Sequence, residues 1–323
     1  MLRLTTPGFQ RFGQARQFEI TFGGAEANVA VAIAQLGGSA GFITKLPANE
    51  IADRTLTELR GLGVDVGSVV RGGDRIGVYF LEQGVGQRPG KVIYDRAHSA
   101  IAGADLGDFD WEKIFAGASW FHWSGITPAL SESAAAAVEQ ACIAARRLGL
   151  TVSFDLNYRS KLWTQERAGA VLAPLMPHVD LCVTSVEEIR TVFGIDAPAE
   201  PMEREMTAAR RMSERFGMKS VAITMREASS AGESRWGAML YHKGKFSFSR
   251  RCDVTIVDRL GAGDSFTGAL IFALRRGDES QKAVDFAIAA SALKHTIPGD
   301  YNVVSLAEVE ALAAGGHGGR VQR

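Results

Sequence analysis

The sequence predicts an α/β fold in which a mostly parallel central sheet is covered by helices on both faces. From about residue 98 onward, short apolar or β-branched runs alternate with amphipathic helical stretches, as in consecutive βαβ units. Runs of this kind are typical of parallel strands that helices cover on both sides. The strand-like runs lie at 120–123, 151–155, 181–184 and 220–224, and the clearest helical stretches lie at 132–148 and 203–216.

The first hundred residues follow a different pattern. Separated strand patterns occupy 17–22, 76–82 and 91–96, and a loop rich in Gly, Gln and Pro at 83–90 joins the last two. Local pairing of this kind is typical of a sheet that has one solvated face. We therefore expect a small second sheet before the βαβ region begins.

The composition favours a small-molecule partner. A chain of 323 residues can form one large α/β domain or two ordinary ones, and either buries a sizeable core. Lysine plus arginine equals aspartate plus glutamate, so the formal net charge is zero. Because no basic excess is present, we expect neither a nucleic acid nor an anionic membrane as the partner.

The cysteines and the apolar runs point to the cytoplasm. Cys142, Cys182 and Cys252 are odd in number and far apart, so we expect buried thiols in a reducing compartment rather than disulfides or a zinc site. No signal peptide is evident, and the apolar runs are far shorter than the ~20 residues that span a bilayer. We expect a soluble cytoplasmic protein.

A glycine turn in the last third of the chain carries the strongest functional signal. Gly261, Ala262 and Gly263 fall between a predicted strand at 254–257 and a helical pattern that follows. Glycines allow close approach of the backbone, and the free N–H groups of a helix N-terminus attract phosphate oxygens. Asp264 would then lie beside a phosphoryl group and is able to take a proton from an attacking hydroxyl. Alternatively, Asp264 only caps the helix and the glycines only form a turn.

Other nucleotide-binding motifs are absent from the sequence. The segment 84–92 differs from a P-loop in its glycine–lysine spacing, and it has valine where serine or threonine must bind magnesium. A dinucleotide-binding GxGxxG motif is also missing, which disfavours a dehydrogenase. Polar residues nevertheless follow the predicted parallel strands, at the sheet edge where ligands bind. They are Asn157, Arg159, Glu188 and Arg226.

Two signatures resemble one known family. The GAGD turn resembles the C-terminal signature of the PfkB, or ribokinase-like, sugar kinases, and Gly23-Gly24-Ala25-Glu26-Ala27-Asn28 resembles their N-terminal glycine pair. The resemblance implies a ribokinase-like three-layer α/β/α sandwich with a discontinuous β-lid over the sugar site, and a homo-oligomer formed through that lid. It places the core at 1–8, 23–74 and 98–323 and the lid at 9–22 and 75–97.

The resemblance also implies ATP and Mg²⁺ as cofactors. It assigns Asp264 as the base and Gly261 to Gly263 as the cradle of the transferred phosphoryl group. Glu188 remains from a magnesium-binding element in which Ser185 replaces asparagine, so it would bind Mg²⁺ through water; alternatively it is an acid in a solvated helix turn. Ser291 lies on a small-residue helix face that suits either an adenine ring or close helix packing. The other residues expected at ATP are Asn157, Arg159, Thr224, Arg226, Glu227 and Ser229.

Four segments look like the 2-keto-3-deoxygluconate kinase branch of this family, at 75–82, 92–97, 154–159 and 296–300. That branch phosphorylates the terminal hydroxyl of an acid sugar to give the 6-phosphate. A buried carboxylate must be paired, and Arg96 and Arg159 offer forked donors. Tyr79 and Tyr94 suit a polyol chain, although cross-strand packing of the tyrosines and a surface position for Arg96 are the alternatives. Gly24, Asn28, Asp264 and Asp300 complete the expected sugar site.

Two other functions stay open on the sequence alone. One is a kinase of a neutral sugar such as ribose or fructose, and the other is a sugar-binding regulator of the same fold that has lost catalysis. The regulator is suggested by Ser185 and by the N-terminus, since relatives open with a full strand and Met1 to Leu4 resemble only its end. On that resemblance, we expect the natural start to lie upstream of Met1.

Overall fold

The computed structural model describes residues 1–228 and 230–316, and a large sheet organises that part of the chain. Within it, seven strands form this sheet, in the order β12-β11-β10-β9-β8-β7 with β13 paired to β11. The four strands from β7 to β10 are parallel, as predicted, and β11 to β13 add an antiparallel end. The strands are β7 Trp120–Ser124, β8 Thr151–Asp155, β9 Leu181–Thr184, β10 Ser220–Ala228, β11 Glu233–His242, β12 Lys245–Phe248 and β13 Cys252–Thr255.

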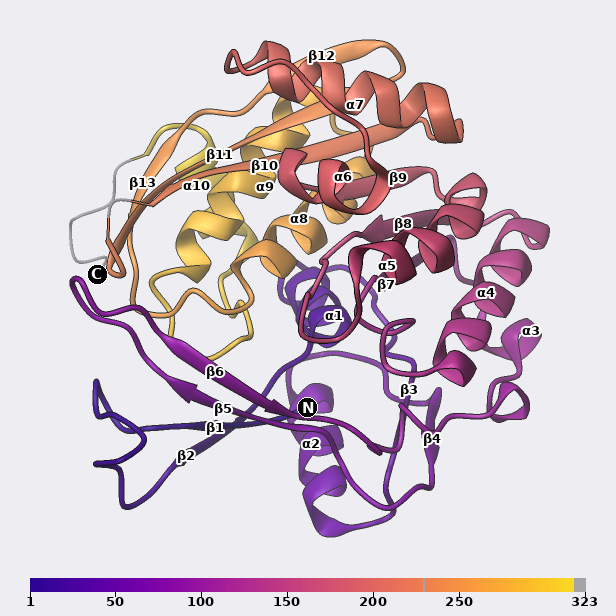
Figure 1. Cartoon of the computed structure of the whole chain (residues 1–323), viewed down its shortest axis with the longest axis vertical. Helices are drawn as coiled ribbons and strands as arrows, with labels where there is room; N and C mark the ends of the chain where they lie inside the picture. The colour runs from indigo at the N-terminus through magenta and orange to yellow at the C-terminus, as the bar shows by residue number, and fades with distance from the viewer. Residues whose placement is uncertain (229, 317–323) are drawn as a thin grey trace.

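Helices cover both faces of the large sheet (Figure 1). Cys182 and Val221 pack toward one helical layer, and the adjacent Leu181 and Ala222 pack toward the other, because successive strand residues point to opposite faces. The first layer comprises α4 Glu132–Arg147, α5 Gln165–Leu172, α6 Val186–Phe193 and α7 Glu203–Phe216. The second comprises α8 Ala262–Arg276, α9 Ser280–Lys294 and α10 Leu306–Ala313, with α1 Ala25–Gln35 packed on α8.

Short elements complete the fold. A parallel pair of strands, β3 Thr44–Leu46 and β4 Val69–Arg71, flanks α2 Glu50–Gly61, whose buried residues pack with Leu46 and Phe22. The other short helices are α3 Trp111–Ile114 and the 3₁₀ helices η1 Leu106–Asp108 and η2 Ala173–His178. No helix in the described part of the chain is long and apolar enough to cross a membrane. All three cysteines are free thiols; Cys142 and Cys182 are buried, and Cys252 is half-buried.

A four-stranded sheet forms the β-lid and lies apart from the large sheet, at the lower left of Figure 1. Its strand order is β2-β1-β5-β6, with β1 antiparallel to β2 and parallel to β5. The hairpin β5–β6 matches the predicted strand pair and its connecting loop. The bounds are β1 Leu2–Thr5, β2 Glu19–Phe22, β5 Val78–Glu82 and β6 Lys91–Asp95.

The placement of β1 corrects one prediction. Residues 1–8 were expected in the core, as the end of a strand of the central sheet, but β1 pairs with β2 and β5 in the lid. The reason is the alternation of Leu2, Arg3 and Leu4, which fits a sheet that has one apolar face and one polar face. The prediction is therefore wrong for β1.

The register of the lid gives its two faces different chemistry. One row across the strands joins Ile20, Leu4, Phe80 and Ile93, and its end residues Ile20 and Ile93 are 47% and 43% exposed. We call this the outer row. The adjacent row, here called the inner row, joins Thr21, Arg3, Tyr79 and Tyr94.

Helices α1 and α8 approach each other closely at Gly268. A Cβ atom added there would lie 2.8 Å from the Cβ of Ala32 and 2.9 Å from the carbonyl oxygen of Val29. Only a glycine fits at this distance without a shift of α1. This contact fixes how the N-termini of the two helices lie relative to each other.

Candidate active site

A cavity of about 580 Å³ lies between the inner row of the lid and the N-termini of α1 and α8. It is lined by all eight residues that were expected to bind the sugar, although their positions in the chain span almost 280 residues. They are Gly24, Asn28, Tyr79, Tyr94, Arg96, Arg159, Asp264 and Asp300, and Asn157 and Gly261 line the same cavity.

The turn that begins α8 has the geometry of an anion site. Gly261 is the N-cap residue with φ +79°, and a side chain there would collide with the backbone carbonyl of Asp300. Gly263 has no atom within 4 Å of an added Cβ, so this side of the turn is open. Among the described residues no side chain caps α8. The Ala262 N–H donates a long bond of 3.4 Å to the Arg259 carbonyl oxygen, and the N–H groups of Gly263 and Asp264 are available to phosphate oxygens.

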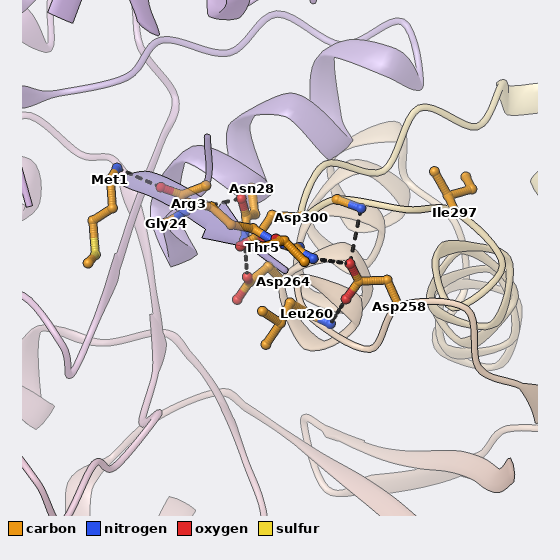
Figure 2. A network of polar contacts seen from close by, with 12 residues as sticks. Met1, Arg3, Thr5, Gly24, Asn28, Asp258, Leu260, Asp264, Ile297 and Asp300 are labelled. Atoms are coloured by element: carbon orange, nitrogen blue, oxygen red, sulfur yellow. Dashed lines mark hydrogen bonds and ion pairs between the residues drawn. The ribbon is translucent and has the colours of Figure 1, made fainter. Parts of the chain in front are cut away.

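Asp264 lies in the first turn of α8 and points at Asn28 of α1 (Figure 2). The Nδ2 atom of Asn28 donates a hydrogen bond of 2.6 Å to Oδ2 of Asp264. Burial raises the pKa of Asp264 to about 7; the bond from Asn28 opposes this rise, and the charge of Asp300 adds to it. Asp264 makes no capping bond, so the alternative that it only caps the helix is not supported.

Two guanidinium groups, those of Arg96 and Arg159, line the cavity, and neither forms an ion pair with another described residue. Arg96 is 8% exposed, and its guanidinium lies 4.2 Å from the centre of the Tyr94 ring. Within residues 1–228 and 230–316 it forms no ion pair, and its buried Nε has no hydrogen-bond partner. Burial lowers the pKa of Arg96, and the neighbouring charge of Arg159 lowers it further. A buried, unpaired cation beside a second one is the environment that attracts an anionic ligand.

The aromatic residues of the lid play a double role. The rings of Tyr79 and Tyr94 lie 5.9 Å apart, so the cross-strand packing that was the alternative interpretation is present. Both rings also line the cavity, where Tyr79 is buried and Tyr94 is 38% exposed. Packing and ligand contact are therefore compatible for these two side chains.

The predicted metal ligand Glu188 is engaged by its own helix. Ser185 and Glu188 form a capping box at the start of α6, and the carboxylate also accepts a hydrogen bond of 3.0 Å from the Tyr158 N–H. Asp155 lies nearby at the end of β8. Its pKa is raised well above the usual value by burial and by the negative charges of Glu188 and Asp264.

Three of the residues expected at the nucleotide, Thr224, Arg226 and Glu227, lie on β10, and none of these three lines the cavity. Thr224 donates to the Thr184 carbonyl oxygen at 3.5 Å, and Glu227 pairs with Arg251. Burial lowers the pKa of Arg226, and the charge of Arg259 lowers it further, so two cations lie close together here. Ser229 lies outside the described residues.

Two residues near the turn have unexpected roles. Ser291 was expected to contact ATP, but it is fully buried and its hydroxyl donates to the Ala262 carbonyl oxygen at 2.9 Å. It therefore supports the turn from behind, and no part of it is open to a ligand. Asn157 lines the cavity with φ +40°, in the left-handed region that asparagine tolerates better than most residues.

Sequence reasoning did not assign a role to Arg3 or Glu26. Arg3 is 2% exposed and pairs with Asp258 and Asp300 behind the cavity. Glu26 accepts hydrogen bonds from Ser124 and Thr127, which joins α1 to the end of β7. A charged residue between two leucines, as at Arg3, was the available signal, since such a residue needs a buried partner.

Known proteins of similar sequence agree with this architecture. The model of the pfkB family carbohydrate kinase matches residues 3–305. A 2-dehydro-3-deoxygalactonokinase of Haloferax volcanii is 38% identical over 99% of this chain and 96% of its own length. A 2-dehydro-3-deoxygluconokinase of Thermoproteus tenax is 31% identical over 93% of this chain and 86% of its own.

Solved structures agree as well. The crystal structure of a 2-dehydro-3-deoxygluconokinase from Thermotoga maritima superposes with a TM-score of 0.96 at 49% identity, and covers 97% of this chain and 95% of that one. It supports the ribokinase-like fold, with a mostly parallel central sheet and a small β-lid. The family match extends over nearly the whole chain and includes both glycine signatures. The chain therefore belongs to the PfkB family of carbohydrate kinases.

Proposed function

We propose that the protein is an ATP-dependent kinase of a 2-keto-3-deoxy sugar acid, with 2-keto-3-deoxygluconate as the substrate and the 6-phosphate as the product. The observation that carries this proposal is the unpaired Arg96 beside Arg159, in the same cavity as Asp264. A neutral sugar would leave the buried Arg96 guanidinium without an ion-pair partner once water is excluded. A sugar carboxylate supplies that charge.

The chemistry of the reaction follows from the arrangement of Asp264 and the turn before it. The substrate's terminal hydroxyl would lie next to Asp264, which takes its proton as the oxygen attacks the γ-phosphorus of ATP. The bond between that phosphorus and the β–γ bridging oxygen breaks, and ADP leaves. The N–H groups of Gly261 to Gly263 would hold the oxygens of the transferred group, which carry the developing charge.

Magnesium fits the acidic residues on the other side of the turn. Burial and the negative charges of Glu188 and Asp264 raise the pKa of Asp155, the charge of Arg159 opposes this rise, and a divalent cation would relieve the remaining repulsion. Because Glu188 already accepts bonds from Ser185 and Tyr158, it would hold the ion through water. When bound, Mg²⁺ neutralises charge on the phosphates of ATP. Arg226 and Arg259 would contact the same phosphates from β10 and from the turn.

The same residues distinguish the proposed function from the two alternatives, a neutral-sugar kinase and a regulator without catalysis. Plant fructokinases are also similar to this chain, the one from Oryza sativa being 29% identical over 86% of it. Arg96 is the residue that favours an acid sugar over a neutral one. A regulator without catalysis is disfavoured by Asp264, which keeps its bond from Asn28 and a pKa near neutrality.

A substrate panel tests this function. The kcat/KM for 2-keto-3-deoxygluconate should exceed that for ribose and fructose by on the order of 10²-fold, because a buried guanidinium would otherwise stay unpaired. ADP formation is measured with each sugar, and the galactonate epimer is run in parallel. Arg96→Met is the matched control, since it should lower turnover of the acid sugar and leave the neutral sugars unaffected. Equal kcat/KM for ribose or fructose would favour the neutral-sugar kinase, and binding without turnover of any sugar would favour the regulator.

The pH dependence of the reaction should show the titration of Asp264. The base must be deprotonated, and its pKa is raised to about 7, so kcat/KM should fall as the pH drops below that value. The midpoint of this acid limb should lie well above the ordinary aspartate value of about 4. The measurement is kcat/KM for the acid sugar at saturating ATP from about pH 5.5 to 8.5. A profile that is flat over this range would mean that a different group accepts the proton.

Self-association through the lid remains a prediction. The outer row exposes apolar side chains at both of its ends, and Phe18 packs on Phe80 of this row with 5.7 Å between the ring centres. Exposed apolar rows of this kind are typical of surfaces that a second subunit covers. The proposed activity does not depend on it.

A further inference from the structure

Arg3 connects the inner row of the lid to the glycine turn at Gly261 to Gly263, here called the catalytic turn (Figure 2). Its Nη1 donates to Oδ1 of Asp300 at 2.7 Å, its Nη2 pairs with Oδ2 of Asp258, and its Nε donates to the Thr5 hydroxyl at 2.8 Å. All three nitrogens of the guanidinium are therefore used. The side chains of Arg3 and Asp258 are each 2% exposed, and that of Asp300 is 8% exposed.

Asp258 links Arg3 to the backbone of two separate segments. Its Oδ1 accepts a hydrogen bond of 3.1 Å from the N–H of Leu260, the residue before the glycine turn. Its Oδ2 accepts one of 3.1 Å from the N–H of Gly299, the residue before Asp300. One carboxylate thus joins the catalytic turn to the segment that carries Asp300.

Asp300 fills the space that two glycines leave open. A side chain on Gly23 would collide with the Asp300 carboxyl group, and one on Gly261 would collide with its backbone carbonyl. The Nδ2 atom of Asn28 lies 3.4 Å from Oδ2 of Asp300 and 2.6 Å from Oδ2 of Asp264, so one amide contacts both carboxylates. A shift of Asp300 would therefore displace three parts together: the turn at Gly261, the backbone at Gly23, and Asn28, which donates to the proposed base.

We propose that Arg3 is a positioning residue for phosphoryl transfer, which holds Asp300 and the catalytic turn in register with the lid. This proposal rests on the proposed function for its kinetic consequence. Arg3 touches none of the reacting atoms and acts through Asp258 and Asp300. A forked guanidinium suits the task because it reaches two carboxylates at once, whereas an ammonium group offers a point charge.

The second buried cation nearby does not replace Arg3. Lys294 is fully buried close to the two carboxylates, and their charges oppose the lowering of its pKa by burial. Its Nζ donates to the carbonyl oxygen of Ile297 at 3.0 Å and forms no ion pair with Asp258 or Asp300 among the described residues. Without Arg3, these two buried carboxylates would lose their paired cation.

The test compares Arg3→Ala and Arg3→Lys with a matched control, Arg88→Ala. Arg88 is also a lid arginine in an ion pair, with Glu82, and it also donates to a backbone carbonyl, that of Phe9. We expect kcat to fall on the order of 10²-fold in Arg3→Ala and less in Arg3→Lys, with KM for ATP nearly unchanged, because small displacements of a catalytic group have this effect. Arg88→Ala should retain the wild-type kcat.

Chemical rescue separates positioning from stability. Guanidinium chloride at concentrations far below the denaturing range should raise kcat of Arg3→Ala about tenfold or more, because the ion can occupy the space between Asp258 and Asp300. It should leave wild type and Arg88→Ala unchanged. If Arg3→Ala does not fold, the Arg3→Lys and Asp258→Asn variants carry the comparison. A kcat within threefold of wild type in a folded Arg3 variant, or rescue of thermal stability without rescue of kcat, would overturn the proposal.

Hydrogen exchange keeps this test independent of the substrate assignment. The amides of Leu260 and Gly299 should exchange at least about tenfold faster in Arg3→Lys than in Arg88→Ala, since their acceptor Asp258 is no longer held. If wild type phosphorylates no sugar in the panel, the proposed function fails, and this exchange result still decides whether Arg3 positions the turn. Unchanged exchange at both amides would reject that role.

Discussion

Replacing Asp264 with asparagine is expected to lower kcat by ~10²–10⁴-fold while the affinity for the sugar changes little. The amide keeps the shape of the carboxyl group and can still accept the hydrogen bond from Asn28 through its oxygen. It cannot accept a proton from the attacking hydroxyl. The measurement is kcat by ADP formation, together with the Kd of the sugar by calorimetry.

Thermal stability provides the control for Asp264→Asn. The pKa of Asp264 is about 7 in the folded protein and near the ordinary aspartate value of 3.8 in the unfolded chain, so the folded state binds more protons between these pH values. The ionised carboxyl group therefore lowers the free energy of unfolding as the pH rises toward 7, and a neutral amide removes this effect. The variant should melt at or above the wild-type temperature at pH 8. A variant that kept more than about a tenth of the wild-type kcat would show that Asp264 is not the base.

The second large effect is expected for Gly261→Ala, with Gly263→Ala as its matched control in the same turn. Gly261 has φ +79° and an added Cβ would collide with the Asp300 carbonyl, whereas an added Cβ on Gly263 meets no atom within 4 Å. The left-handed backbone alone costs roughly 1–2 kcal/mol for alanine, and the collision must also displace Asp300. Gly261→Ala should therefore melt several degrees lower and lose at least ~10²-fold in kcat.

Gly263→Ala should separate the two effects of a methyl group in this turn. Gly263 lies within α8, where alanine is favoured over glycine by about 1 kcal/mol, so the melting temperature should stay unchanged or rise. If the turn holds a phosphoryl group, the methyl group should still weaken activity, because it lies where the backbone approaches the ligand. Melting curves and kcat, measured for both variants, separate the effect of the methyl group on stability from its effect on activity. Equal stability of the two variants would mean that Asp300 does not depend on the glycine at 261.

The parallel half of the large sheet could be predicted because β7, β8 and β9 are short, apolar and each followed by a helix, and because the amphipathic helix α7 precedes β10. The antiparallel strand β11 escaped prediction, since its first residues alternate between buried and exposed around Arg235, 236–240 are buried without alternation, and the last two residues are half-buried. The position of β1 in the lid could not be predicted from the sequence either. Its partners in the lid are set by pairing with residues 19–22 and 78–82, and no local pattern specifies such a register.

The site was predictable where a local motif carries the chemistry. The GAGD segment placed Asp264 at a helix N-terminus beside an open turn, and the structure has that arrangement. The role of Ser291 was not predictable, because a small-residue helix face can line a ligand or pack on a neighbour, and only the tertiary structure decides. The partners of Arg3 lie 255 and 297 positions away in the sequence, so no spacing rule could find them.

These separations have a consequence for the order in which the protein acquires its parts during synthesis. The bond between Asn28 and Asp264 spans 236 positions, and the pair Arg3–Asp300 spans 297. A ribosome adds roughly 5–20 residues per second, so the lid strand and α1 emerge many seconds before their partners exist. During that interval the guanidinium of Arg3, which is buried in the folded protein, is exposed to water. Gly23 likewise lacks its contact with the Asp300 carboxyl group. The candidate sugar cavity is therefore among the last features to form, at a time when β7 to β10 and the helical layer of α4 to α7 have long been synthesised.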